Sequence, residues 1–161
     1  MLELGSTPVL SLVDTHGQDL ALRLQSGGRG TFIYFMRALS CAQCNAAVAR
    51  MVRERLTFDA AGIRVLIAVP EERAAAARWQ EHKNIPFEVV VGISGTAHAE
   101  VGLLRKVFGL VQQSGSILLD QDGVVRHSHV STNPGASYDG AEVAQAISAL
   151  APSTTRPEAN R

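Results

Sequence analysis

The sequence has no excess of charge of either sign, because 15 lysine and arginine residues are balanced by 15 aspartate and glutamate residues. Like charges do not gather into runs, so neither nucleic acid nor a membrane surface is an expected partner. The chain also lacks an apolar run of the roughly 20 residues that a membrane-spanning helix needs. Residues 1–8 contain neither the basic nor the apolar segment of a secretory signal. We therefore expect a cytoplasmic protein.

Cysteine is scarce as well: the 161 residues include two, Cys41 and Cys44. A reducing compartment keeps thiols free, so a close pair of this kind indicates reversible redox chemistry or metal binding more than a structural disulfide. With 46% hydrophobic residues the chain can bury a sizeable core without either. We expect one domain over residues 1–150, a disordered polar tail over 151–161, and no cofactor.

Hydrophobic periodicity predicts strands and helices that alternate along the chain. The predicted strands are residues 31–36, 63–69, 86–91, 116–119 and 124–130, and the predicted helices are 42–58, 71–82, 96–108 and 138–150. An N-terminal β-hairpin, 9–13 with 20–24, precedes them, and the turn 120–123 joins the last two strands into an antiparallel hairpin. This order predicts an α/β fold with a mixed central sheet and helices on both faces, and it is similar to the order of a thioredoxin-like fold.

The two cysteines fall where the first buried strand gives way to the first long helix. Unpaired backbone N–H groups and the positive end of the helix dipole hold a cysteine at this place partly as thiolate, so we predict that Cys41 is the nucleophile. Cys44, one turn further on, can close a disulfide, since bridged cysteines need Cα atoms only about 5 to 6 Å apart. Ser40 is the predicted N-cap, and Arg37 is the nearby cation able to stabilise a thiolate or polarise a peroxide oxygen.

Two alternatives to this interpretation stay open. The first is that Cys41 and Cys44 are ordinary buried residues and Arg37 a surface residue at a strand end. The second is metal binding, because His127 and His129 lie two apart on one predicted strand and face the same side. We expect that strand on the edge of the sheet far from the dithiol, and we predict no metal. For the lone histidines His16, His82 and His98 we predict solvated positions and no role, although His98 begins a helix that could approach the site.

Residues 32–44, FIYFMRALSCAQC, resemble the F-x-R-x-x-x-C-x-x-C signature of peroxiredoxin-like proteins in the alkyl hydroperoxide reductase/thiol-specific antioxidant (AhpC/TSA) family. Phe108 and Gly109, followed by residues 115–126, are similar to a second region of that family. The resemblance implies a thiol-dependent antioxidant enzyme of the thioredoxin fold, with Cys41 as the peroxidatic cysteine and Cys44 as its resolving partner. It also implies a thioredoxin-like dithiol as reductant, and a homodimer is compatible with the sequence.

The family's P-x-x-x-T-x-x-C motif is incomplete in this chain, because Tyr34 and Ala38 stand at its proline and threonine positions. Ser114 takes the place of a second arginine, and residues 112–116 lack the proline that faces the dithiol in thioredoxins. Our first expectation is peroxide reduction by the Cys41/Cys44 dithiol. The alternatives are a thioredoxin-like protein disulfide reductase and a non-catalytic redox sensor or interaction module.

Overall fold

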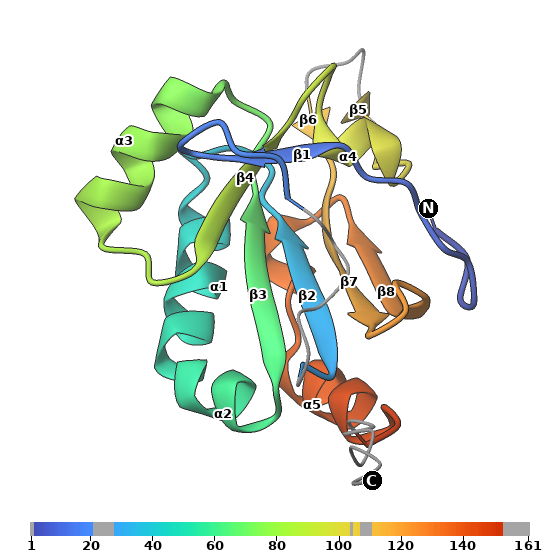
Figure 1. The fold of residues 1–161 in the computed structure, drawn as a ribbon. Coiled ribbons are helices and arrows are strands. Elements are labelled where there is room, and N and C mark those ends of the chain that lie inside the picture. The colour runs from blue at the N-terminus through green and yellow to red at the C-terminus, as the bar shows by residue number, and fades with distance from the viewer. Residues whose placement is uncertain (1, 21–27, 104, 107–110, 153–161) are drawn as a thin grey trace, which may run out of the picture.

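The computed structural model describes residues 2–20, 28–103, 105–106 and 111–152 (Figure 1). In chain order the elements are β1 (Leu12–Asp14), β2 (Gly30–Phe35), α1 (Ala42–Arg53), α2 (Arg55–Ala60), β3 (Ile63–Ala68), α3 (Arg73–Lys83), β4 (Glu88–Gly92), α4 (Ala97–Glu100), β5 (Arg105–Lys106), β6 (Val111–Gln112), β7 (Ser114–Asp120), β8 (Val125–Ser131), the 3-10 turn η1 (Pro134–Ala136) and α5 (Gly140–Ser148). Six strands form a sheet in the order β1-β4-β3-β2-β7-β8, and β5 pairs with β6 apart from it.

The central strand β2 positions the cysteines. It pairs in parallel with β3 and antiparallel with β7, so that Phe32 lies between Val65 and Leu118. All six residues of β2 are buried, as its near-continuous apolar sequence predicts for a strand with neighbours on both sides. Because β2, β3 and β4 run parallel, their carboxyl ends lie at one edge of the sheet (Figure 1). The chain leaves β2 at that edge and reaches Cys41 within a few residues.

Different elements cover the two faces of the sheet. Phe32 and Tyr34 share one buried cluster with residues of α1, α2, α3 and α5. Ile33 and Phe35 point to the opposite face, where α4 and the apolar residues next to β1 cover the sheet. The alternation follows from the two-residue period of a strand. The predicted mixed sheet with helices on both faces is therefore confirmed.

The predicted helix over residues 96–108 is wrong. Helix α4 ends at Glu100, and Gly102 adopts φ 73° while the N–H of Leu103 donates to the carbonyl of His98 at 2.8 Å. A left-handed glycine with this bond is a common helix stop. The short strand β5 follows, so the apolar spacing in this region reflects burial rather than helical periodicity. Residues 104, 107 and 108 of the predicted helical face lie outside the described residues.

The remaining predicted elements are present with shifted ends. The helix predicted over 42–58 is divided at Glu54 into α1 and α2. The turn predicted at 120–123 joins β7 to β8, with the side chain of Asp120 accepting from the N–H groups of Asp122 and Val124. Of the predicted N-terminal hairpin, the structure shows β1 and a bridge between Val13 and Asp19. Residues 21–24 and most of the predicted tail lie outside the described residues.

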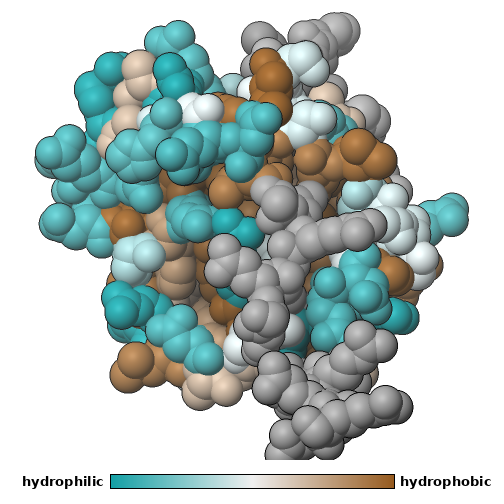
Figure 2. All heavy atoms as spheres, viewed as in Figure 1, coloured by the Kyte–Doolittle hydropathy of each residue, from teal (hydrophilic) through white to brown (hydrophobic). Residues whose placement is uncertain are grey.

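The solvent-facing side of α3 is hydrophilic, and apolar residues show in the layer beneath it (Figure 2). This division agrees with α3 burying Ala76 and Trp79 against the sheet. In the part of the chain that the structure describes, no helix combines the length and the apolar character needed to cross a membrane.

Candidate active site

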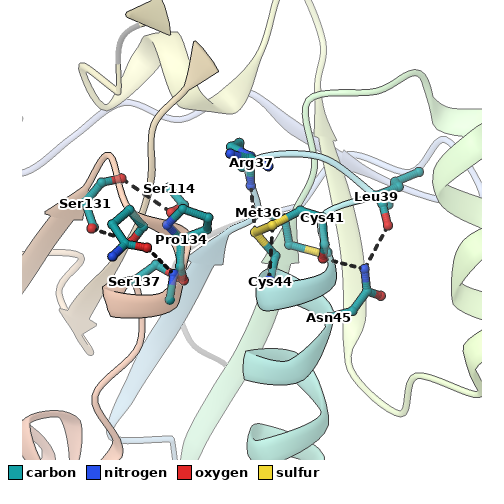
Figure 3. Close-up of a disulfide and its surroundings, with 12 residues drawn as sticks. Met36, Arg37, Leu39, Cys41, Cys44, Asn45, Ser114, Ser131, Pro134 and Ser137 are labelled. Carbon is teal, nitrogen blue, oxygen red and sulfur yellow. Dashed lines mark hydrogen bonds between the residues drawn. A yellow bond between two sulfur atoms is a disulfide. The ribbon is translucent and has the colours of Figure 1, made fainter.

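Cys41 and Cys44 lie at the junction of β2 and α1 and are joined in a disulfide, with their Cα atoms 5.2 Å apart (Figure 3). Cys41 is itself the N-cap of α1, and its Sγ accepts a hydrogen bond from the N–H of Cys44 at 3.2 Å. The prediction that Ser40 caps the helix is wrong, because Ser40 is exposed and the sulfur occupies the capping position. The Cys41 sulfur therefore sits directly on the positive end of the helix dipole.

Both sulfurs are covered by the fold, but to different degrees. Helix α1 turns Cys44 toward the core together with Ala47, Val48 and Met51, and Cys44 has no exposed surface. Cys41 is 4% exposed. The sulfur of Cys44 accepts from the backbone N–H of Arg37 at 3.4 Å. Both cysteines are thus buried, and of the two only Cys41 keeps some exposed surface.

The loop that leads into Cys41 is held by a group that we call the loop anchor, consisting of Asn45, Glu71 and Trp79. The Nδ2 of Asn45 donates to the carbonyls of Leu39 and Cys41, each at 2.8 Å. Its Oδ1 accepts from the indole N–H of Trp79 at 2.9 Å. A carboxylate oxygen of Glu71 accepts from the N–H of Leu39 at 2.8 Å. Leu39 is thus fixed at both of its backbone polar groups.

The opposite wall of the site is η1, which follows β8 and packs against α1 (Figure 3). Ser137 donates to the carbonyl of Pro134 at 2.6 Å, so the 2.6 Å contact between Ser137 and Tyr34 uses the phenol as donor. Burial raises the pKa of Tyr34, against the opposing effect of the Ser137 hydrogen bond, and keeps the phenol protonated. The residue at the family's proline position therefore ties this wall to β2.

Arg37, the predicted helper, follows directly on the last residues of the central strand. The residue is half-buried, and its backbone N–H contacts Cys44, while its guanidinium makes no hydrogen bond or ion pair with another described residue. The side chain is therefore available for an incoming polar group. Its role in the reaction stays a prediction.

His98 lies close to the dithiol, and the expectation of a solvated position is wrong. The side chain is fully buried, and its Nε2 is 2.6 Å from the carbonyl oxygen of Met36. Its ring packs edge-on against Phe35 with centroids 5.3 Å apart. The sequence placed His98 on a helix that could approach the site but gave no reason to assign it a role, because a single histidine gives no periodic signal and 62 residues separate it from Met36.

The histidine pair proposed as a metal half-site lies on β8, which is separated from β2 by β7. The Nδ1 atoms of His127 and His129 face the carboxylate of Glu142 on α5, at 3.8 and 3.9 Å. Within the described ranges, no group of three or more His, Cys, Asp or Glu residues could hold a metal ion. The pair therefore belongs to the packing of α5 on the sheet.

A dithiol at the start of the first long helix, at the carboxyl edge of a mixed sheet of this order, defines a thiol oxidoreductase of the thioredoxin fold. The sequence profile of the AhpC/TSA family matches residues 6–128, and the chain belongs to that family. The resemblance predicted from the sequence is confirmed.

Solved structures share the fold at low sequence identity. Peroxidoxin BcpB from Mycobacterium tuberculosis is 16% identical with a TM-score of 0.74, covering 92% of this chain and 96% of its own. Reduced Prx3 from Vibrio vulnificus in complex with H2O2 is 14% identical with a TM-score of 0.75, covering 91% and 99%. The thiol peroxidase from Chromobacterium violaceum is 17% identical with a TM-score of 0.72, covering 91% and 87%. These likenesses concern the fold, and no curated protein sequence matches the chain.

Proposed function

We propose that the protein reduces peroxides through Cys41 and Cys44, and that a thioredoxin-like dithiol returns it to the reduced state. The observation that carries the proposal is the position of the Cys41 sulfur, which caps α1 and is bonded to the buried sulfur of Cys44. The capping N–H and the helix dipole both favour a thiolate at Cys41. Membership of the AhpC/TSA family supports the same chemistry.

The reaction proceeds in three steps that balance in atoms and electrons. The thiolate of Cys41 attacks one peroxide oxygen, the O–O bond breaks, and the other oxygen leaves as an alcohol or water after taking up a proton. The thiolate of Cys44 then attacks the sulfur of the resulting sulfenic acid, and the hydroxyl group leaves with a proton as water. Finally, two electrons from the external dithiol reduce the disulfide through a mixed disulfide on Cys41.

The geometry supports this division of roles. Both cysteines belong to the first turn of α1, and their Cα separation of 5.2 Å falls within the range of ordinary disulfides. Closure of the bond therefore requires no unfolding of the helix. Cys41 is 4% exposed and Cys44 has no exposed surface, a difference that favours Cys41 as the sulfur that peroxide and external dithiol reach.

We assign the guanidinium of Arg37 to the leaving oxygen or the Cys41 thiolate, because it has no partner among the described residues. An arginine beside an anionic oxygen donates charge-assisted hydrogen bonds. In Arg37→Leu the rate with peroxide should fall about tenfold or more, whereas Arg37→Lys should retain part of it. Equal rates in the three proteins would remove Arg37 from the reaction.

A second candidate is a thioredoxin-like disulfide reductase, and one observation favours it. Ala38 stands where the family motif has a threonine, so this position offers a peroxide no hydroxyl. Disulfide exchange needs only an activated thiol and access, and Cys41 provides both. Turnover of a protein disulfide without a fast reaction with peroxide would favour this function.

The test is a stopped-flow reaction of the reduced protein with hydrogen peroxide, following thiol loss against that of a free thiol at the same pH. The proposal predicts a rate far above the free thiol that is lost in Cys41→Ser. In Cys44→Ser, the first step should persist and the sulfenic acid on Cys41 should be trapped by dimedone. A rate no faster than the free thiol would refute peroxide reduction, and exchanged behaviour of the two variants would refute the assignment of roles.

A further inference from the structure

One peptide group lies between the buried imidazole of His98 and the buried sulfur of Cys44. Its carbonyl, from Met36, is 2.6 Å from the Nε2 of His98. Its N–H, from Arg37, donates to the Sγ of Cys44 at 3.4 Å (Figure 3). Because a peptide group is planar, the contact at its carbonyl fixes the direction of its N–H.

The proton on this contact can be assigned. A carbonyl oxygen only accepts, so the Nε2 of His98 carries the hydrogen and is the donor. The ring is held in this orientation by its edge-on packing against Phe35. Thr96 is the N-cap of its helix, α4, and the Thr96 hydroxyl accepts from the N–H of Ala99 at 3.2 Å. The donor is therefore part of the packed fold.

We propose that His98 is a positioning residue for Cys44 and acts through the Met36–Arg37 peptide. When an external thiolate bonds to the sulfur of Cys41, the disulfide breaks and Cys44 leaves with the electron pair. Negative charge then develops on a sulfur without exposed surface. The Arg37 N–H stabilises that charge, and the hydrogen bond from His98 strengthens this donor by polarising the same peptide and keeps it aimed.

Cys41 provides an internal comparison, because its sulfur accepts from the N–H of Cys44 instead. Loss of the His98 donor should therefore slow the step in which Cys44 leaves and spare the step in which Cys41 attacks. A general loosening of the fold would slow both. The inference rests on the thiol–disulfide half of the proposed function and needs no reaction with peroxide.

The experiment measures the rate at which dithiothreitol reduces the oxidised protein, together with the rate at which hydrogen peroxide oxidises the reduced one. His98→Leu should slow reduction several-fold, with about tenfold as the upper limit, because tenfold is the effect of losing the whole Arg37 hydrogen bond to the developing charge. His98→Gln keeps an N–H donor of similar reach and should restore most of that rate. The matched control is His127→Leu, which removes a buried histidine from β8 and should leave the reduction rate unchanged.

A measurement on the wild-type protein adds a test that needs no variant to fold. On reduction, the amide proton of Arg37 should shift downfield in the NMR spectrum, and the Nε2 of His98 should keep its proton in both redox states. Equal slowing of reduction and peroxide oxidation in His98→Leu, no rescue in His98→Gln, or an Arg37 amide unaffected by reduction would overturn the inference. A slow reaction with peroxide alongside the expected pattern of reduction rates would refute only the proposed peroxidase function.

Discussion

Asn45→Ala is the substitution that tests most directly how the loop that leads into Cys41 is held in place. The side-chain amide of Asn45 makes three hydrogen bonds, two as donor to the carbonyls of Leu39 and Cys41 and one as acceptor from Trp79. Alanine removes all three without changing the cysteines. The backbone carbonyl of Cys41 keeps a second partner, the N–H of Asn45 at 2.9 Å. The main losses therefore fall on Leu39 and on the indole of Trp79.

The expected cost follows from these contacts. Each hydrogen bond contributes about 1 kcal/mol net, and leaving the buried indole N–H without its acceptor adds about 1 kcal/mol more. The better helix propensity of alanine returns about 0.6 kcal/mol. The free energy of unfolding of the oxidised protein should thus fall by about 2.5 to 3.5 kcal/mol, with the lower figure applying when the second partner of the Cys41 carbonyl compensates for the lost bond. Asn133→Ala is the control, because that exposed side chain caps only the N–H of Gly135 and should cost about 1 kcal/mol.

The assay is urea unfolding followed by far-UV circular dichroism, since Trp79 is the only tryptophan and its emission would itself respond to the change. Trp79→Phe and the double variant complete a cycle. The double variant should be about 1 kcal/mol more stable than the sum of the two single effects predicts, because the shared hydrogen bond is lost only once. A cost of Asn45→Ala below about 0.5 kcal/mol, or strict additivity, would refute the loop anchor.

Three further predictions concern two charged side chains and the fluorescence of Trp79. Burial disfavours the charge of Asp120, but hydrogen bonds from the turn N–H groups and Arg126 hold its pKa below the usual value. The charged Asp120 therefore stabilises the fold above about pH 4, and this stabilisation is lost as the pH falls through the pKa of the folded protein. Asp120→Asn should lower the melting temperature at pH 7 and flatten its decline in acid. Burial lowers the pKa of His127, and the charge of Glu142 opposes this effect. Glu142→Gln should therefore lower the pKa of His127 further, so that the melting temperature falls more steeply as the pH is lowered from about 7 to about 5. Parallel curves of melting temperature against pH for the variant and the wild type would contradict this. Trp79 donates a hydrogen bond to Asn45 of α1, the helix that carries the two cysteines. The fluorescence emission of Trp79 should rise when the disulfide is reduced. Cys44→Ser, which cannot form the disulfide, should show no such rise.

The sequence predicts the fold wherever one local signal decides the structure. The residues of β2 form a continuous apolar run, which only a central strand with both faces covered can bury, and the register confirms that position. The segment after Thr96 shows the limit of this reasoning. Val101 is buried, as its place on the predicted helix requires, but Gly102 takes a left-handed conformation and ends the helix beside it. Periodicity alone does not distinguish these two ways of burying the same residues.

In the candidate site, too, the sequence could predict some residues and not others. Cys41 and Cys44 could be found because they lie together in sequence at a junction of strand and helix. The loop anchor and the contact of His98 could not be found in this way, because the contacts of Trp79 and Glu71 span 34 and 32 residues and that of His98 spans 62. Such pairs are brought together by the strand order, which places β2 beside β3. No spacing in the sequence encodes them.

The departures from the family motif and the rigid surroundings of the dithiol are consistent with each other. Since Cys44 lies one helical turn from Cys41, the disulfide forms within α1 and the loop before it can be anchored in both redox states. Without the motif's proline, Tyr34 instead carries a buried phenol that bonds to Ser137 and ties η1 to the sheet. The chain therefore surrounds its two sulfurs with fixed hydrogen bonds on both walls. A dithiol held in this way favours rapid closure and reopening of the same bond over a large change of conformation.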